Sequence, residues 1–283
     1  PKVDKLSYTI SAQNKVAEKT EHRFDGSLDI QWQVSSFSSL VKENTNNKFE
    51  EFKDYDEMEN SPEIEEESEL NIFTFPAGAK VGSCWHEIFE EISFDDSLPI
   101  IRKKAEEKLT TYGILPADEK IRQQYIDITA NMVEAVLNCK ISTENNIRLK
   151  RLDDDHKINE LEFFFAVKND VQRKQINDLL GAYNIVFNHN IPNGFLVGFI
   201  DLVFQKDEKF YILDWKSNAV GRSLQNFSRE NIVLEMHEHK YHLQYLIYTV
   251  ALHKFLKQRI PEYDYDRHFG GVYYIFLRGV DKN

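Results

Sequence analysis

Cysteine is scarce in this sequence, which contains only Cys84 and Cys139 among its 283 residues. Two thiols are too few for a disulfide scaffold, a four-cysteine zinc site or a four-cysteine iron–sulfur cluster. The disulfide-rich secreted classes are therefore excluded, and a reducing cytoplasm is the expected location.

Long hydrophobic segments and nucleotide-binding motifs are missing as well. No apolar run reaches the length of about eighteen residues that a transmembrane helix needs, so we expect no membrane partner. No charged-then-apolar stretch opens the sequence, so we expect no signal for secretion. The motif G-x-x-x-x-G-K-[ST] is absent, which excludes a P-loop ATPase from these residues. Because the chain begins with Pro1 rather than Met, we expect a piece of a longer protein, in which any ATPase motor would lie upstream.

Positive charge is in deficit, since the net charge is −12 at pH 7. The excess is local, because residues 50–69 contain eleven acidic residues and one lysine. Such a stretch cannot bury enough apolar surface to pack, so we expect an acidic flexible insert at about 43–70. The remainder is nearly neutral, and its charge neither excludes DNA as a partner nor argues for it.

The apolar pattern predicts a polar leading extension at 1–30 and one domain at 31–283. Helical periodicity predicts helices at about 83–92, 98–112, 118–137, 171–183 and 229–258. Alternation predicts strands at 147–152, 160–167 and 271–277 and a hairpin at 194–216. The expected fold class is α/β or α+β, with a mixed sheet flanked by helices.

The hairpin GFLVGFIDLVF–QKDEK–FYILDWKSN contains the first candidate site. A turn centred on Asp207 and Glu208 places Asp201 across from Asp214, with Cβ atoms roughly 4.5–5.5 Å apart. Lys216 follows Asp214 by two residues and points to the same face. Carboxylates this close repel one another unless a proton or a cation lies between them.

Their chemistry suits a hydrolytic metal site. Carboxylate oxygens are ligands that Mg²⁺ prefers, and the ion can polarise a scissile phosphate and lower the pKa of an attacking water. Lys216 can orient that water or offset charge on the phosphate. The competing interpretation is an Asp–Lys ion pair on an exposed hairpin, although aspartate disfavours strand interiors as apolar as these.

The sequence Asp201, a strand, then Asp214-Trp215-Lys216 resembles the signature of the PD-(D/E)XK nuclease superfamily. Together with YHLQYLIYTVALHKFL and HFGGVYYIFLRGV, the hairpin resembles the C-terminal nuclease domain of the RecB family, the exodeoxyribonuclease V beta subunit. The likeness is strongest over 194–281 and thinner back to Trp32. Trp215 stands where that family has Tyr, and Ile200 replaces the proline of the general signature; neither change removes a reacting group.

This resemblance implies a restriction-endonuclease-like core and an Mg²⁺-dependent deoxyribonuclease. One or two ions are expected, and Mn²⁺ or Ca²⁺ can substitute. The metal ligands implied are His86 in VGSCWHEIFEEI, Asp201, Asp214 and the backbone carbonyl of Trp215. Glu90 lies one helical turn after His86 and is the expected partner of the imidazole.

Three further active-site residues are implied by the resemblance. An acid lies in the strand ELEFFF, where Glu160 is favoured, although Glu162 has the same side-chain direction. Gln244 and Tyr248 form a Q-x-x-x-Y pair on one helix face, with Gln244 contacting the metal site or DNA and Tyr248 supporting it. From the residues alone, an exposed acidic strand and a polar pair satisfied in the core explain these patterns equally well.

Weaker candidates for phosphate contact are Lys240, Tyr241 and Arg278, for which ordinary surface charge is an equal explanation. The run HEHK, from His237 to Lys240, suggests zinc at first. One helix places too few of these side chains on a common face for a closed zinc site, so we reject this interpretation.

The leading hypothesis is hydrolysis of DNA phosphodiesters by the nuclease domain of a RecBCD-like helicase–nuclease, in double-strand-break repair and DNA degradation. The resemblance implies RecC and RecD as partner subunits and a surface for the strand-exchange protein RecA. One alternative is a catalytically inactive nuclease fold that serves as a DNA- or protein-binding scaffold, which loss of an Asp or Lys from the cluster would mark. Another is a sequence-specific restriction endonuclease, which the motifs after Lys216 disfavour.

Overall fold

The computed structural model describes residues 32–41, 69–142, 144, 146–167, 171–181, 186, 191 and 193–281. The predicted leading extension and most of the predicted acidic insert lie outside the described residues, and both remain predictions. Within the described ranges, no helix combines the length and the hydropathy that crossing a membrane requires.

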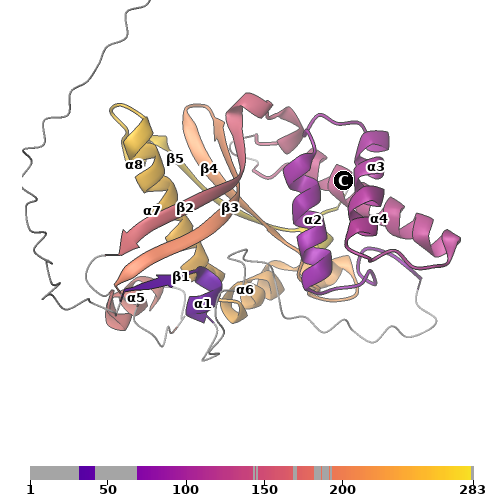
Figure 1. Ribbon diagram of the computed structural model, residues 1–283, viewed down its shortest axis with the longest axis horizontal. Helices are drawn as coiled ribbons and strands as arrows, with labels where there is room; N and C mark the ends of the chain where they lie inside the picture. Colours follow the sequence, from indigo (N-terminus) through magenta and orange to yellow (C-terminus); the bar gives the residue numbers. More distant parts are fainter. Residues whose placement is uncertain are drawn as a thin grey trace, which may run out of the picture. The chain divides into compact units, whose positions relative to one another are not determined.

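The described strands form one mixed sheet. They are β1 (Gln33–Ser35), β2 (Lys157–Val167), β3 (Gly194–Lys206), β4 (Lys209–Lys216) and β5 (Phe269–Phe276). Their order is β1-β3-β4-β5, with β2 also paired to β3. The helices are α1 (Phe37–Val41), α2 (Ala79–Glu91), α3 (Leu98–Thr111), α4 (Glu119–Asn138), α5 (Arg173–Leu180), α6 (Arg229–Glu238), α7 (Tyr241–Arg259) and α8 (Tyr265–His268). The predicted mixed sheet with flanking helices is confirmed (Figure 1).

The hairpin β3–β4 has the predicted register near its turn, but the predicted pairing of Asp201 with Asp214 is not formed, because the ladder ends one residue earlier. Lys206 pairs with Lys209, and the ladder continues to Leu202 and Leu213. The two turn residues have positive φ angles, 50° at Asp207 and 64° at Glu208. This is the type I′ geometry, whose twist matches that of the strands it connects.

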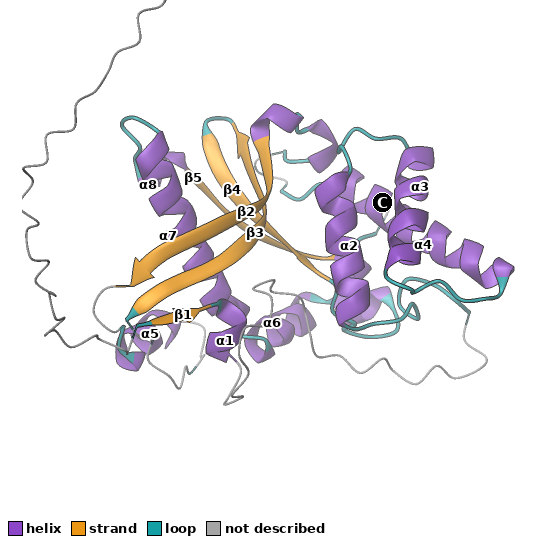
Figure 2. Ribbon diagram, viewed as in Figure 1, coloured by secondary structure: helices purple, strands orange, loops and turns teal. Residues whose placement is uncertain are grey.

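Beyond Leu202 and Leu213 the two central strands separate. β3 continues beside β1 and β2, whereas β4 continues in parallel beside β5. Figure 2 shows β2 and β3 turning to one side of the sheet and the ends of β4 and β5 to the other. We call the point of divergence the fork, and define it by Asp201 and Asp214, the first residues past the shared ladder.

Two apolar cores pack against the sheet. Leu202, Leu213 and Trp215 belong to a core shared with α2, α3 and α4. Ile200, Val203 and other sheet residues belong to a second core with α7, α1 and α5. Helix α7 contributes a buried stripe at helical spacing to that core, which consists of Leu243, Ile247, Ala251, Leu252 and Leu256.

Two predicted elements are wrong. The single helix expected at 229–258 is broken between α6 and α7, where Lys240 adopts a left-handed backbone with φ 55°. The strand expected at 147–152 is absent; Ile147 forms an isolated bridge with Ser142, and residues Leu149–Arg151 form a short 3-10 helix. In addition, α2 begins one turn before the predicted start, and α5 is shorter than the predicted helix at 171–183.

Candidate functional site

The fork brings Asp201 to the end of β4. Its Oδ2 accepts a hydrogen bond of 2.8 Å from the backbone N–H of Trp215. This bond replaces the strand-to-strand pairing that ends one residue earlier, and it fixes the carboxylate in the gap between the strands. The side chain of Asp201 is 11% exposed, so water or a ligand can still reach it.

Glu160 lies opposite Asp201. The antiparallel register pairs Asn159 with Leu202 and Leu161 with Ile200, which leaves Glu160 facing Asp201. Its φ of 49° is a left-handed conformation inside a strand, a strain of about 1–3 kcal/mol that the surrounding structure must enforce and that is common at active sites. Glu162 is exposed, so the structure brings Glu160 rather than Glu162 to the fork.

His86 reaches the same place from α2. Its ring is 4% exposed, and Nδ1 lies 3.4 Å from Oδ2 of Asp201. One ligand atom each from His86, Glu160 and Asp201 lie within 4.8 Å of one another. One imidazole nitrogen and two carboxylates form a donor set that fits a divalent cation.

Asp214 is directed toward Lys216 rather than into that group of three. Its Oδ2 lies 2.7 Å from Nζ of Lys216, and both side chains are 2% exposed. Burial raises the pKa of Asp214 to about 8; the charge of Lys216 opposes the rise, and the negative charge of Asp201 adds to it. A buried carboxylate with a strongly raised pKa indicates a functional site when it lies beside other ionisable groups.

Two tyrosines surround the ammonium group of Lys216. Nζ lies 3.9 Å from the ring centroid of Tyr241 and 5.6 Å from that of Tyr274. Such ring faces attract a desolvated cation by up to about 2 kcal/mol. Tyr241, a weak candidate for phosphate contact by sequence, therefore lies beneath the lysine and is 3% exposed.

Tyr274 connects the fork with the predicted Q-x-x-x-Y pair. It is the β5 residue that pairs with Asp214. Its hydroxyl lies 3.1 Å from Oε1 of Gln244 and 3.1 Å from the backbone oxygen of Tyr241, and its one proton serves one acceptor at a time. Gln244 in turn donates from Nε2 to the Tyr248 hydroxyl at 3.1 Å. Gln244 and Tyr248 are each 1% exposed, so they lie behind the fork and support it from α7.

Tyr274 was missed by sequence reasoning. The signal available was its position in the strand GVYYIFL, where the parallel partner of an aspartate strand places one tyrosine beside that aspartate. Asn218 was missed too. It is 1% exposed and accepts a hydrogen bond of 3.2 Å from the Tyr241 hydroxyl, which holds the ring beneath Lys216.

Two sequence candidates have other roles. Arg278 is buried and donates hydrogen bonds to four backbone oxygens, those of Ser217, Ile72, Phe75 and Pro76. It ties the segment before α2 to the end of β4 and is not available for phosphate contact. The side chain of Glu90 is exposed, and its backbone oxygen accepts a bond from Asn159, so this part of the prediction finds no support in the geometry.

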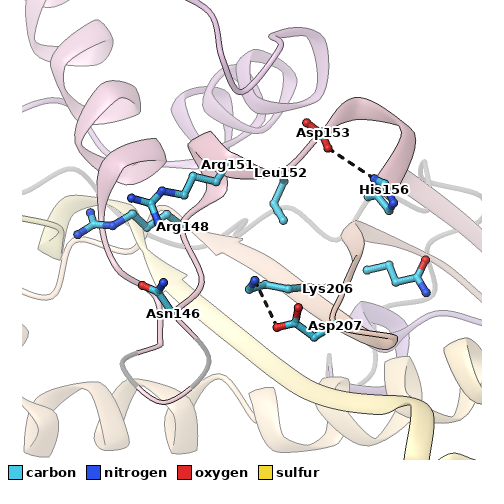
Figure 3. Close-up of a pocket in the computed structure, with 9 residues that line it drawn as sticks. Asn146, Arg148, Arg151, Leu152, Asp153, His156, Lys206 and Asp207 are labelled. Atoms are coloured by element: carbon cyan, nitrogen blue, oxygen red, sulfur yellow. Dashed lines mark ion pairs between the residues drawn. The ribbon is translucent and has the colours of Figure 1, made fainter.

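A cavity of about 240 Å³ at the turn of the β3–β4 hairpin contains none of the predicted site residues. Figure 3 shows Arg148 and Arg151 at one end, Asp153 with His156 at the other, and Lys206 beside Asp207 between them. Lys206 is paired with Asp207 at 3.3 Å, and His156 with Asp153 at 3.9 Å. Its charges largely balance, which favours an ordinary surface hollow.

Comparison with known proteins gives a consistent result. Residues 63–282 match the family described as the PD-(D/E)XK nuclease superfamily. The RecBCD enzyme subunit RecB of Haemophilus influenzae is 32% identical over 297 residues, which cover 96% of this chain and 23% of that protein. The subunit from Escherichia coli K12 is 34% identical over 77% of this chain and 18% of its own length. That from Buchnera aphidicola of Acyrthosiphon pisum is 33% identical over 88% of this chain and 21% of its own. The chain thus spans about a fifth of the length of these curated relatives.

Proposed function

The chain belongs to the PD-(D/E)XK nuclease superfamily, and from this premise we propose that its fork hydrolyses DNA phosphodiester bonds with the help of Mg²⁺. The observation that carries the proposal is the convergence of four separate segments. Helix α2 supplies His86, β2 supplies Glu160, β3 supplies Asp201, and β4 supplies Asp214 and Lys216. Nothing in the packing of an inert fold requires these ionisable groups to be buried together.

His86, Glu160 and Asp201 would hold the cation, with Asp214 and the carbonyl of Trp215 as the further ligands that the sequence predicts. One or two ions fit this assignment, and Mn²⁺ or Ca²⁺ can take the place of Mg²⁺. When bound, the ion supplies a Lewis acid for the phosphate and a lowered pKa for a bound water.

Lys216 performs the remaining chemistry from the protein side. Its ammonium group is a donor fixed by Asp214 on one side and the Tyr241 ring on the other. In that position it can orient the attacking water and stabilise negative charge that develops on the phosphate oxygens. Gln244 and Tyr248 act through Tyr274, by holding the ring that closes the site from behind.

The biological setting follows from the relatives, whose printed description is RecBCD enzyme subunit RecB. We propose that this domain acts within a RecBCD-like helicase–nuclease in the cytoplasm, in double-strand-break repair and DNA degradation, with RecC and RecD as partner subunits and RecA as a further partner. A catalytically inactive scaffold is the alternative. The presence of Asp201, Asp214 and Lys216 together disfavours it, because decay of a nuclease to a scaffold removes selection on these groups.

Cleavage of single-stranded DNA tests the proposal. The 283-residue chain should degrade a labelled oligonucleotide with Mg²⁺ and stop when EDTA is added. Asp214→Ala and Lys216→Ala should each lower the rate at least about 100-fold. Asp207→Asn, at the far end of the same hairpin, is the matched control and should cleave normally, since Asn tolerates its left-handed backbone. Unchanged rates in folded Asp214→Ala and Lys216→Ala protein would contradict the assignment of cleavage to the fork, and absence of cleavage by the wild-type chain would favour the scaffold.

A further inference from the structure

Strand β2 carries Glu160 to the fork and then continues for seven residues to Val167. Among the described residues it pairs only with β3, so its other edge borders no strand. From Glu160 to Phe164 the strand advances about 13 Å. Any polymer that leaves the fork along this edge therefore meets the side chains of β2 in order.

Aromatic rings gather on one face of this strand pair. Leu161 and Phe163 point into the core with α7, so the alternate residues point to the opposite face. Phe164 lies there, 61% exposed, and stacks on Phe195 of β3 with centroids 4.4 Å apart. Phe195 contacts Trp32, which is 48% exposed, at 5.3 Å. We call Trp32, Phe164 and Phe195 the aromatic platform.

Cations line a groove at the same edge. The groove has a volume of about 850 Å³ and runs between β2 and the last two turns of α7. The groove lies on the α7 side of β2, and Phe164 is the platform residue that also lines it, at the edge between the two faces. Lys254, Arg259 and Glu162 line it as well. Lys254 lies 5.5 Å from the ring of Phe165 and Arg259 lies 3.8 Å from that of Phe255. Both side chains are exposed, and within the described part of the chain neither is paired with a carboxylate.

We propose that the outer edge of β2 binds single-stranded DNA, with bases stacked on the aromatic platform and backbone phosphates near Lys254 and Arg259. The inference rests on the proposed function, since the strand is the one that enters the fork. Exposed aromatic faces and exposed cations along one strand edge are a combination that binds single strands without regard to sequence, because every base has a stacking face and every nucleotide a phosphate. A purely apolar partner surface would leave the two cations without a role.

Tryptophan fluorescence offers a direct test, made in EDTA so that no cleavage occurs. The chain has three tryptophans, of which Trp85 is 0% exposed and Trp215 3%, so Trp32 is the one that reports on solvent and ligand. Oligodeoxythymidine should quench its emission, whereas an abasic oligonucleotide of equal length and charge should not. Phe164→Ala should weaken oligonucleotide binding roughly five-fold or more. Ile100 on α3 is an apolar residue of similar exposure, 52%, and Ile100→Ala should bind normally.

The cationic part has its own matched control. Lys254→Ala with Arg259→Ala should weaken binding and flatten its dependence on salt, because fewer phosphate contacts release fewer counterions. Lys257→Ala lies on the same turn of α7, is exposed, and does not line the groove, so it should change neither. Normal oligonucleotide affinity in Phe164→Ala and in the double variant, with cleavage intact, would overturn this inference and leave the nuclease standing; the platform would then belong to a protein partner. Absence of cleavage by the wild-type protein with Mg²⁺ would instead contradict the proposed function.

Discussion

Glu160 combines strain and negative charge at one residue. Its φ of 49° is unfavourable for any residue with a Cβ, and its carboxylate lies against Asp201. The backbone strain and the repulsion between the two carboxylates both destabilise the folded protein when no cation is bound. They indicate that this position is selected for chemistry rather than for stability.

Glu160→Gly should therefore separate activity from stability. Glycine accepts positive φ and removes the repulsion with Asp201, so the free energy of unfolding in EDTA should rise by about 1 kcal/mol while cleavage falls at least about 100-fold. Glu162→Gly is the control at the neighbouring position with ordinary φ. It should retain cleavage and lose about 0.5–1 kcal/mol in urea denaturation. A destabilised Glu160→Gly protein that still cleaves would contradict the assignment.

Tyr274 should act as a positioning residue. In Tyr274→Phe the ring stays beside Lys216, but the hydrogen bond to Gln244 or the Tyr241 backbone is lost. The lost hydrogen bond is worth about 1 kcal/mol, and it helps to position the groups around Lys216. We therefore expect kcat to fall roughly five-fold and KM for the oligonucleotide to stay unchanged. Tyr273→Phe, whose side chain packs in the opposite core, supplies the comparison. Equal effects of the two substitutions on kcat would show that the Tyr274 hydroxyl has a structural role only.

Residues of the site differ in how far the sequence could reveal them. Asp201, Asp214 and Lys216 follow from a two-residue turn and strand alternation, both of which are local. The choice between Glu160 and Glu162 is not local, because it depends on a reversal of the backbone at Glu160 that no propensity encodes. The burial of Arg278 depends on carbonyls about 200 positions away in sequence, so its predicted phosphate contact could not be corrected from sequence alone.

Helices α2 and α3 are joined by ion pairs that stabilise the support of His86. Lys108 is buried, with 8% of its surface exposed. Its Nζ lies 3.0 Å from Oε2 of Glu87, and it also pairs with Glu91. Lys104 pairs with Glu91 at 3.0 Å. The hydrogen bond from Lys108 is the main cause that holds the pKa of Glu91 below its usual value of 4.5.

The stability from this network should depend on pH in one direction. Because the folded state lowers the pKa of Glu91, its contribution is present above pH 4.5 and is lost as the pH falls through the lower, folded-state pKa. Lys108→Met should thus cost less than about 1 kcal/mol at pH 7, since Glu91 is 41% exposed, and progressively less in acid. Lys103→Met, exposed on the same helix, should cost little at either pH. Urea denaturation that shows an equal loss for Lys108→Met at pH 7 and pH 3 would contradict this account.

At the scale of elements, long amphipathic patterns were predictable and interruptions were not. Helices α3 and α4 match their predicted bounds to within about one residue. The break between α6 and α7 falls at Lys240, a residue with no helix-breaking tendency, and tertiary contacts of Tyr241 with Asn218 and Tyr274 account for it. The segment near Ile147 has strand-forming residues, but no neighbouring strand is there to pair with it beyond one bridge.

For the molecule as a whole, net charge says little about function, whereas the geometry of the fork says much. The excess of acidic residues lies in the predicted insert, whereas the described domain concentrates its functional signal where β3 and β4 diverge. The fork, the family match to residues 63–282 and the likeness to RecB subunits all point to one activity, even though the chain covers about a fifth of those relatives.

Crystals soaked in Mn²⁺ would test the central claim most directly, through anomalous diffraction. The account predicts a peak in the fork, about 2.0–2.3 Å from a nitrogen of His86 and from carboxylate oxygens of Glu160 and Asp201. The peak should vanish in crystals of Asp201→Asn protein. Manganese bound elsewhere, with none in the fork, would contradict the proposal that these residues form a metal-dependent nuclease site.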